Sequence, residues 1–322
     1  MTPDRRWIGS LEVSFPGLGG NNFGGRLDAL GTREVVEAAL EAGVTHFDTA
    51  DIYGGGASET LLGDALAHRR DEVVIATKFA MGQLPDGLSG GDPRWVMRAC
   101  EQSLRRLGVE TIDLYLLHRP DPAVPIGETL AALDRLIEQG KVREIGCSNF
   151  SAEQLTEAHE VARERGLRGF ACVQNEYNLL AVEPQRGVIA ACEALGLAFV
   201  PYFPLAMGLL SGKYRRGRPL PAGTRLTGTA DPEDQAFVVE RLATVGRLAD
   251  YAERRGHTLL ELALGWLASQ DRVVSVIAGA MTAAQVRGNV AAVSSWRLTP
   301  GEMAEVEQLT VDTGERGQTP PA

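Results

Sequence analysis

Features that define membrane and secreted proteins are missing from this 322-residue sequence. No stretch offers the roughly 18 uninterrupted apolar residues of a membrane span. The first residues, MTPDRRWIGSLEV, contain no apolar run that resembles a signal sequence. We therefore expect a cytoplasmic protein without a membrane partner.

Cysteine and histidine are both scarce. The four cysteines, Cys100, Cys147, Cys172 and Cys192, are far apart and form no C-x-x-C pair, which argues against a disulfide framework and against a zinc site. The five histidines show no ligand spacing, so we expect no metal.

Runs of basic residues interleaved with aromatics are also absent, and the net charge of -10 disfavours binding to phosphate backbones. Nucleic acid is therefore not an expected partner. Hydrophobic residues make up 44% and charged residues 23%, as in ordinary globular proteins. The length suits one β/α barrel with insertions, so residues 1–322 are expected to form a single domain, with 313–322 as a flexible tail.

Short β-branched or apolar runs alternate along the chain with segments of helical periodicity. The expected strands are 15–20, 45–50, 73–78, 112–118, 142–149, 171–177, 197–205 and 273–280. The expected helices are 32–42, 58–69, 93–107, 127–139, 151–166, 184–195, 257–270 and 282–292. Several open with a capping residue, namely Thr32, Ser58, Ser151 or Thr282. Several are followed by a glycine suited to a left-handed helix stop, namely Gly43, Gly108, Gly140, Gly166 and Gly196.

Repeated strand–helix units predict a parallel sheet, and eight of them close most naturally into an α/β fold of the (β/α)8 TIM barrel type. An open doubly wound sheet is the competitor, but no G-x-G-x-x-G follows an early strand. A hairpin at 6–13 with its turn at Gly9-Ser10 could plug the amino-terminal end of the barrel. The Gly/Pro/Arg-rich stretch 211–231 and the helical segment 233–254 lie outside the repeat, as extra elements towards the C-terminus.

Ionisable side chains stand at the carboxyl ends of three consecutive predicted strands, where the active site of such a barrel is built. They are Asp48, Tyr53, Lys78 and His118. Each alone is consistent with a capping, ion-pair or structural role. Together they suit carbonyl reduction, because a hydride added to a carbonyl leaves an alkoxide that needs a proton. A nearby Lys78 would ease proton release from Tyr53, Asp48 would hold Lys78 charged, and His118 could orient the carbonyl oxygen.

The string DTADIYGGGASETLLGDAL resembles the signature of the aldo-keto reductase family, as do TKF around Lys78 and LLHRPDP around His118. The resemblance runs from about Gly19 to Asn289 and keeps the family's motif order. It implies a β/α barrel, NADPH bound before a small-molecule carbonyl substrate, and a catalytic tetrad of Asp48, Tyr53, Lys78 and His118.

The same resemblance implies cofactor positions. SNF at 148–150 suggests that Ser148 and Asn149, with Gln174, bind the nicotinamide carboxamide, and that Tyr202 stacks on the nicotinamide ring. The backbone groups of Leu205, Gly208 and Leu209, together with Lys213, resemble the loop over the pyrophosphate.

IAGAMTAAQVRGN at 277–289 resembles the segment that binds the adenosine phosphate, and its matching positions are Gly279, Gln285 and Asn289. Many relatives have proline at Ala278 and a basic residue at Met281. A 2'-phosphate needs charged donors, so NADPH is expected while NADH stays open as the cofactor, with Thr282 and Arg287 as substitute ligands.

The substrate pocket is weakly specified. The side chains that could line it are Phe23, Phe79, Met81, Trp95 and Met207, although each is equally consistent with the core. Two other functions fit the pattern: a cofactor-binding regulatory subunit similar to channel β subunits, and a sugar-nucleotide ketoreductase with a groove formed by 211–231. The sequence does not distinguish a monomer from a homo-oligomer.

Overall fold

The computed structural model describes residues 4–82, 84, 87–182, 185–214 and 232–310. The predicted tail at 313–322 and most of the predicted 211–231 insertion lie outside these residues.

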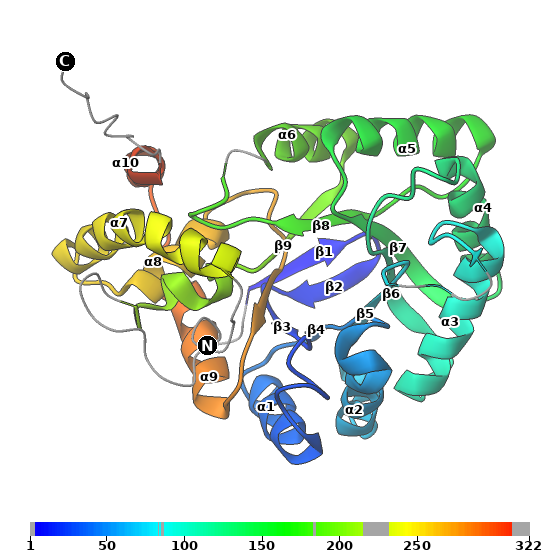
Figure 1. The fold of residues 1–322 in the computed structure, drawn as a ribbon, viewed down its shortest axis with the longest axis horizontal. Helices are drawn as coiled ribbons and strands as arrows, with labels where there is room; N and C mark the ends of the chain where they lie inside the picture. The colour runs from blue at the N-terminus through cyan, green and yellow to red at the C-terminus, as the bar shows by residue number, and fades with distance from the viewer. Residues whose placement is uncertain (1–3, 83, 85–86, 183–184, 215–231, 311–322) are drawn as a thin grey trace.

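Eight parallel strands close into a barrel in the order β10-β3-β4-β5-β6-β7-β8-β9 (Figure 1). The strands are β3 Pro16–Gly19, β4 His46–Asp48, β5 Val74–Phe79, β6 Ile112–Leu117, β7 Val142–Ser148, β8 Cys172–Glu176, β9 Ala198–Tyr202 and β10 Val276–Gly279. The barrel closes where β10 pairs with β3, with Val276 opposite Pro16, and with β9, with Ile277 opposite Tyr202. This arrangement confirms the predicted (β/α)8 barrel and rules out the open sheet.

Helices surround the strands as an outer layer (Figure 1). Those of the repeat are α1 Ala29–Glu41, α2 Ala57–Leu66, α3 Pro93–Leu107, α4 Ile126–Glu138, α5 Ala152–Arg165, α6 Arg186–Leu195, α8 Leu259–Ala268 and α9 Ala283–Ser295. Two further helices are α7 Pro232–Arg254 and α10 Pro300–Thr310, and short 3-10 turns are η1 Tyr53–Gly56, η2 Arg70–Glu72 and η5 Ala206–Ser211. Within the part of the chain that the structure describes, no helix has the length and apolar character of a membrane span.

An amino-terminal hairpin closes one end of the barrel, as predicted. β1 Arg5–Ile8 and β2 Leu11–Ser14 pair antiparallel across a turn at Gly9, whose φ is 56°. Ile8 and Leu11 are fully buried in the cluster that contains Val74 and Ala198, the first residues of β5 and β9. The hairpin therefore plugs the amino-terminal end of the strands and leaves their carboxyl end open.

Two of the four predicted helix caps are confirmed. Ser151 and Thr282 accept hydrogen bonds from the first turns of α5 and α9. The prediction that Thr32 is a cap is wrong, because α1 begins one turn earlier with Asp28 as its cap. Ser58 is also wrong: it lies inside α2 and donates instead to the carbonyl oxygen of Gly20. The five predicted glycine stops all have positive φ.

Candidate active site

The four ionisable residues predicted at the strand ends converge on the open rim. Asp48 ends β4, Lys78 lies in β5 one residue before its end, and His118 directly follows β6. Tyr53 opens η1, in the connection after β4. Parallel strands bring their carboxyl ends to one rim, which is why residues distant in sequence meet there.

Lys78 and Asp48 form a buried ion pair beneath the rim. The Lys78 Nζ lies 2.5 Å from Asp48 Oδ1 and donates to the Thr49 carbonyl oxygen at 2.9 Å. Gln174 Nε2 donates to the second Asp48 oxygen at 2.8 Å. Burial lowers the pKa of Lys78, but the charge of Asp48 and its interactions with Tyr53 raise it more, so the net pKa is above its ordinary value. Lys78 is therefore an ammonium at neutral pH.

Tyr53 lies against this ammonium. The Lys78 Nζ stands 5.1 Å from the centre of the Tyr53 ring, and the two side chains also hydrogen-bond. The glycines after Tyr53 make the turn possible, because Gly54 has a φ of 58° and a Cβ there would lie 2.8 Å from the Phe23 carbonyl oxygen. The sequence Tyr-Gly-Gly-Gly thus holds the phenol close to β5.

His118 faces Tyr53 across the rim, edge to face, with ring centres 6.0 Å apart. Burial, then the positive charges of Lys78 and Arg119, lower the pKa of His118 to about 3. The imidazole is therefore neutral at physiological pH. Its Nδ1 is buried and has no hydrogen-bond partner among the described residues.

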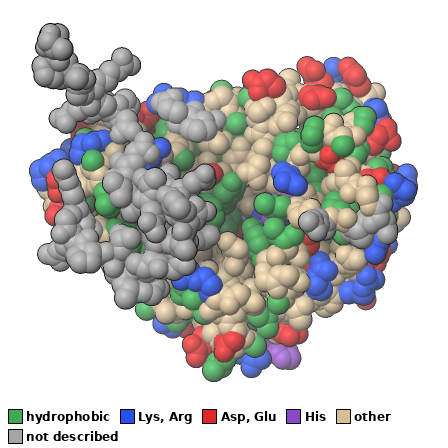
Figure 2. Space-filling model, in the orientation of Figure 1, with side chains coloured by type: hydrophobic (Ala, Val, Ile, Leu, Met, Phe, Trp, Pro, Cys, Tyr) green, Lys and Arg blue, Asp and Glu red, His purple; other side chains and the backbone are tan. Residues whose placement is uncertain are grey.

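A cavity of about 900 Å³ opens beside these groups, with Asp48, Tyr53 and His118 in its wall. Figure 2 shows the face of the molecule on which hydrophobic side chains gather around a central hollow. Such a volume is large enough for a cofactor or drug-sized ligand.

Four predicted nicotinamide-binding residues lie in the cavity wall and bond to each other: Ser148, Asn149, Gln174 and Tyr202. Ser148 Oγ donates to the Gln174 carbonyl oxygen at 2.6 Å, and the Tyr202 hydroxyl donates to Asn149 Oδ1 at 2.8 Å. Asn149 Nδ2 in turn donates to the His118 carbonyl oxygen at 2.9 Å. Burial raises the pKa of Tyr202 to about 12, so it stays a neutral donor. The network links the proposed cofactor wall to His118.

The predicted phosphate-binding residues are mostly on the same wall. Leu205, Gly208 and Lys213 line the cavity, whereas Leu209 is fully buried in the core and does not. Gly279, Gln285 and Asn289 also line it, whereas Thr282 does not, because its side chain caps α9. Gly208 has a φ of 99° and lies close to Lys213, since a Cβ there would be 3.0 Å from the Lys213 Nζ. The cavity wall therefore brings together six of the eight predicted phosphate-binding residues.

Three of the predicted substrate-pocket residues do not line the cavity. Phe23, Phe79 and Trp95 are buried in the core and are absent from the cavity wall. Successive strand residues point to opposite faces, so with Lys78 at the rim Phe79 faces outward, where it stacks on Tyr115 at 4.5 Å. Met81, which is 37% exposed, lines the cavity as predicted. Met207 also lines it.

Several residues that line the cavity were not among those expected from the sequence. Asn21, Asn22 and Arg26 come from the loop between β3 and α1, Ile52 precedes Tyr53, and Phe203 follows β9. The rule that strand carboxyl ends build the site would have indicated this first loop. Phe23 of this loop is buried in the core, whereas its polar neighbours line the cavity.

Metal ligands do not gather anywhere in the described parts of the chain: no group of three His, Cys, Asp or Glu side chains there could hold an ion. The four cysteines are free and buried.

Known proteins that resemble this chain include members of one enzyme family. The model of the aldo/keto reductase family matches residues 17–311. L-glyceraldehyde 3-phosphate reductase of Escherichia coli strain K12 is 32% identical over 324 residues, covering 95% of this chain and 92% of that protein. A probable voltage-gated potassium channel subunit beta of Oryza sativa subsp. japonica is 33% identical over 299 residues, covering 90% of each chain. Probable aldo-keto reductase 1 of Glycine max is 34% identical over 276 residues, covering 84% of this chain and 77% of that protein.

Proposed function

Because this chain belongs to the aldo/keto reductase family and is an oxidoreductase, we propose that it reduces an aldehyde or ketone to an alcohol with NADPH. Tyr53 gives the proton. The observation that carries this proposal is the buried Lys78 ammonium beside the Tyr53 phenol, with a neutral imidazole opposite.

Tyr53 is the proposed general acid because its surroundings favour loss of its proton. An unperturbed phenol has a pKa of about 10 and gives up its proton poorly at neutral pH. An ammonium within hydrogen-bonding distance stabilises the phenolate that forms when the proton leaves. Asp48 holds the Lys78 Nζ in place from the other side. The proton goes to the alkoxide oxygen as the alcohol forms.

His118 is the proposed orienting group. A neutral imidazole carries one N–H. Because the buried Nδ1 has no acceptor among the described residues, the tautomer in this proposal carries its proton on Nε2. An Nε2–H at the rim can donate to the substrate's carbonyl oxygen and hold it near the Tyr53 hydroxyl. Because the imidazole does not titrate near pH 7, it would orient the oxygen without competing as the acid.

NADPH supplies the hydride when bound. The residues proposed to hold its nicotinamide half are Ser148, Asn149, Gln174 and Tyr202. Those proposed for its phosphates and adenosine are Leu205, Gly208, Lys213, Gly279, Gln285 and Asn289, with the backbone around Leu209 and Thr282 adjoining them. Lys213 contributes positive charge beside Gly208, where the backbone is open to close approach.

A regulatory role is the second candidate, because one relative is named a channel subunit beta. A protein with this role would bind the cofactor but reduce carbonyl substrates slowly. The alternative of a sugar-nucleotide ketoreductase depended on a groove at 211–231, and most of that stretch lies outside the described residues.

The test is oxidation of NADPH and of NADH in the presence of aldehydes, ketones, quinones, keto-sugars and L-glyceraldehyde 3-phosphate, the last because of the relative's name. We expect turnover with at least one carbonyl, dependent on its concentration. Tight NADPH binding without turnover on any of them would favour the regulatory role instead.

A further inference from the structure

The wall of the cavity at the start of α9 carries no charge of its own. The residues there are Gly279, Ala280, Met281, Ala284, Gln285 and Gly288. A 2'-phosphate on the adenosine ribose needs charge-assisted donors. The segment that the family resemblance assigns to this phosphate therefore lacks the cation that would bind it.

The two substitutes suggested by the sequence are both engaged elsewhere. The Thr282 side chain accepts a hydrogen bond from the Gln285 backbone as the cap of α9. Arg287 forms an ion pair at 3.0 Å with Glu41 of α1 and is absent from the cavity wall. Neither side chain is in position to meet a ligand in the cavity.

Two cations do line the cavity among the described residues, Lys213 and Arg26. Lys213 lies at the η5 loop, beside Gly208 and 5.1 Å from the centre of the Tyr214 ring. Arg26 comes from the other side of the barrel closure, in the loop between β3 and α1. No described carboxylate lies within ion-pair distance of the exposed Arg26 guanidinium. It is therefore available to an anionic ligand.

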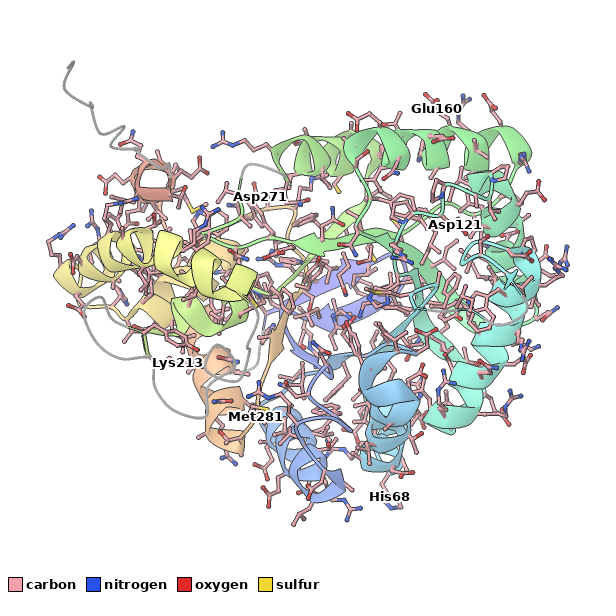
Figure 3. The ribbon with its side chains drawn as sticks, viewed as in Figure 1. His68, Asp121, Glu160, Lys213, Asp271 and Met281 are labelled. Atoms are coloured by element: carbon pink, nitrogen blue, oxygen red, sulfur yellow. The ribbon has the colours of Figure 1, made fainter. Side chains whose placement is uncertain are left out.

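The loop that carries Arg26 contacts the segment before α9. Asn22 Nδ2 donates to the Ala280 carbonyl oxygen at 3.2 Å, directly before Met281. The backbone N–H of Arg26 donates to the Asn22 carbonyl oxygen at 3.0 Å, which closes the turn. Below this contact β3 and β10 are paired strands, with Gly19 opposite Gly279. Lys213 and Met281 lie on the same side of the barrel, beside α9, while Asp121 lies across it (Figure 3).

We propose that Arg26 binds the 2'-phosphate of NADPH and supplies the charge that Met281 cannot. The inference rests on the proposed use of a nicotinamide dinucleotide. A dinucleotide phosphate has two separated anionic groups, the pyrophosphate and the 2'-phosphate, and this cavity offers two cations from different elements. Lys213 comes from the end of η5, and Arg26 comes from the β3–α1 loop, which contacts the segment before α9. A guanidinium matches a phosphate bidentately and stays charged at all physiological pH. Preference for NADPH over NADH would follow from this one side chain.

The test is the dissociation constant of NADPH and of NADH, measured by titration calorimetry without substrate. Arg26→Ala should weaken NADPH binding by roughly ten- to one-hundredfold, the range for a hydrogen bond to a charged group, and change NADH binding by less than about twofold. Arg287→Ala is the matched control and should change neither constant. Adding Met281→Lys to Arg26→Ala should recover much of the NADPH affinity, because a cation is restored at the same wall.

Four results would overturn the inference. Equal weakening of both cofactors would place Arg26 at the pyrophosphate. Unchanged NADPH binding would place the 2'-phosphate on another residue, and unchanged binding with a raised KM for anionic carbonyls alone would place Arg26 at the substrate. If the unsubstituted protein bound neither dinucleotide, the proposed function itself would fail, and this inference with it.

Discussion

Asp51 is a half-buried carboxyl group that lies in sequence between Asp48 and Tyr53 of the proposed tetrad. Burial, then the negative charge of Glu59, raises the pKa of Asp51 to about 7, and Arg106 offsets only part of this. Its Oδ1 is buried with no hydrogen-bond partner among the described residues. Its backbone N–H donates to the Lys78 carbonyl oxygen at 3.0 Å. A group that titrates near neutrality therefore adjoins the strand that carries Lys78.

Asp51→Asn should make the protein more resistant to unfolding at high pH. The pKa of Asp51 is higher in the folded state than in the unfolded chain, so the folded state binds this proton more tightly. The resulting contribution to the free energy of unfolding is fully present at low pH and is lost as pH rises from about 4 to about 7. Asparagine cannot ionise. The free energy of unfolding of the variant relative to wild type should rise by about 2–3 kcal/mol between pH 5 and pH 8. Urea unfolding at the two pH values measures it.

Asp64→Asn, on the exposed face of α2, controls for the loss of one negative charge. Parallel stability curves for wild type and Asp51→Asn at both pH values would contradict a raised pKa.

The positions of site residues could be predicted from the sequence where those residues stand at the carboxyl ends of strands. Asp48, Lys78 and His118 follow from the barrel rule, because each stands at the end of a β-branched or apolar run. The outward position of Phe79 could have been predicted by the same reasoning, since a strand that presents Lys78 to the rim must turn the next residue to the helices. The pKa of Asp51 was not predictable, because Glu59 on α2 and Arg106 on α3 approach it only in the folded chain.

At the scale of elements, α2 and α3 pack closely through a glycine. A Cβ at Gly63 would lie 2.2 Å from the Leu107 carbonyl oxygen, which is backbone and cannot move aside cheaply. Gly63 therefore has a packing role in the middle of a helix, where glycine is otherwise unfavourable.

Gly63→Ala should lower the free energy of unfolding by roughly 1–3 kcal/mol, because the steric cost exceeds the gain in helix propensity. Gly246→Ala in α7 is the matched control, since a Cβ there meets nothing within 4 Å. It should raise the free energy of unfolding by up to about 1 kcal/mol. Urea unfolding of both variants is the measurement, and equal stability of the two would show that the α2–α3 contact tolerates the methyl group.

Helix starts were less predictable than strands. The eight strands follow from local runs, but the caps depend on competition between nearby side chains and distant partners. Asp28 caps α1, so Thr32 lies inside the helix. The Ser58 hydroxyl hydrogen-bonds to the Gly20 carbonyl oxygen and to the Thr49 hydroxyl instead of capping α2. Ser151 was predictable because Gln154, three residues on, completes a capping box within the same turn.

At the scale of the whole molecule, the barrel separates a closed end from an open one. The β1–β2 hairpin fills the amino-terminal end with Ile8, Leu11 and Val13, while the proposed chemistry lies at the carboxyl end. The count of eight strand–helix units predicted that the sheet closes into a barrel. The position of Arg26 was not predictable from its local sequence, because its loop meets the start of α9 only when the first and last barrel strands pair.

The proposed proton transfer from Tyr53 is tested most directly by Tyr53→Phe in a single turnover. Enzyme, NADPH and the best carbonyl from the panel are mixed, and NADPH oxidation is followed, with the dissociation constant of NADPH measured separately. We predict that the variant binds NADPH within about twofold of wild type but oxidises it at least about a hundredfold more slowly, as expected when a general acid is lost. A variant that kept most of the wild-type rate would contradict the account.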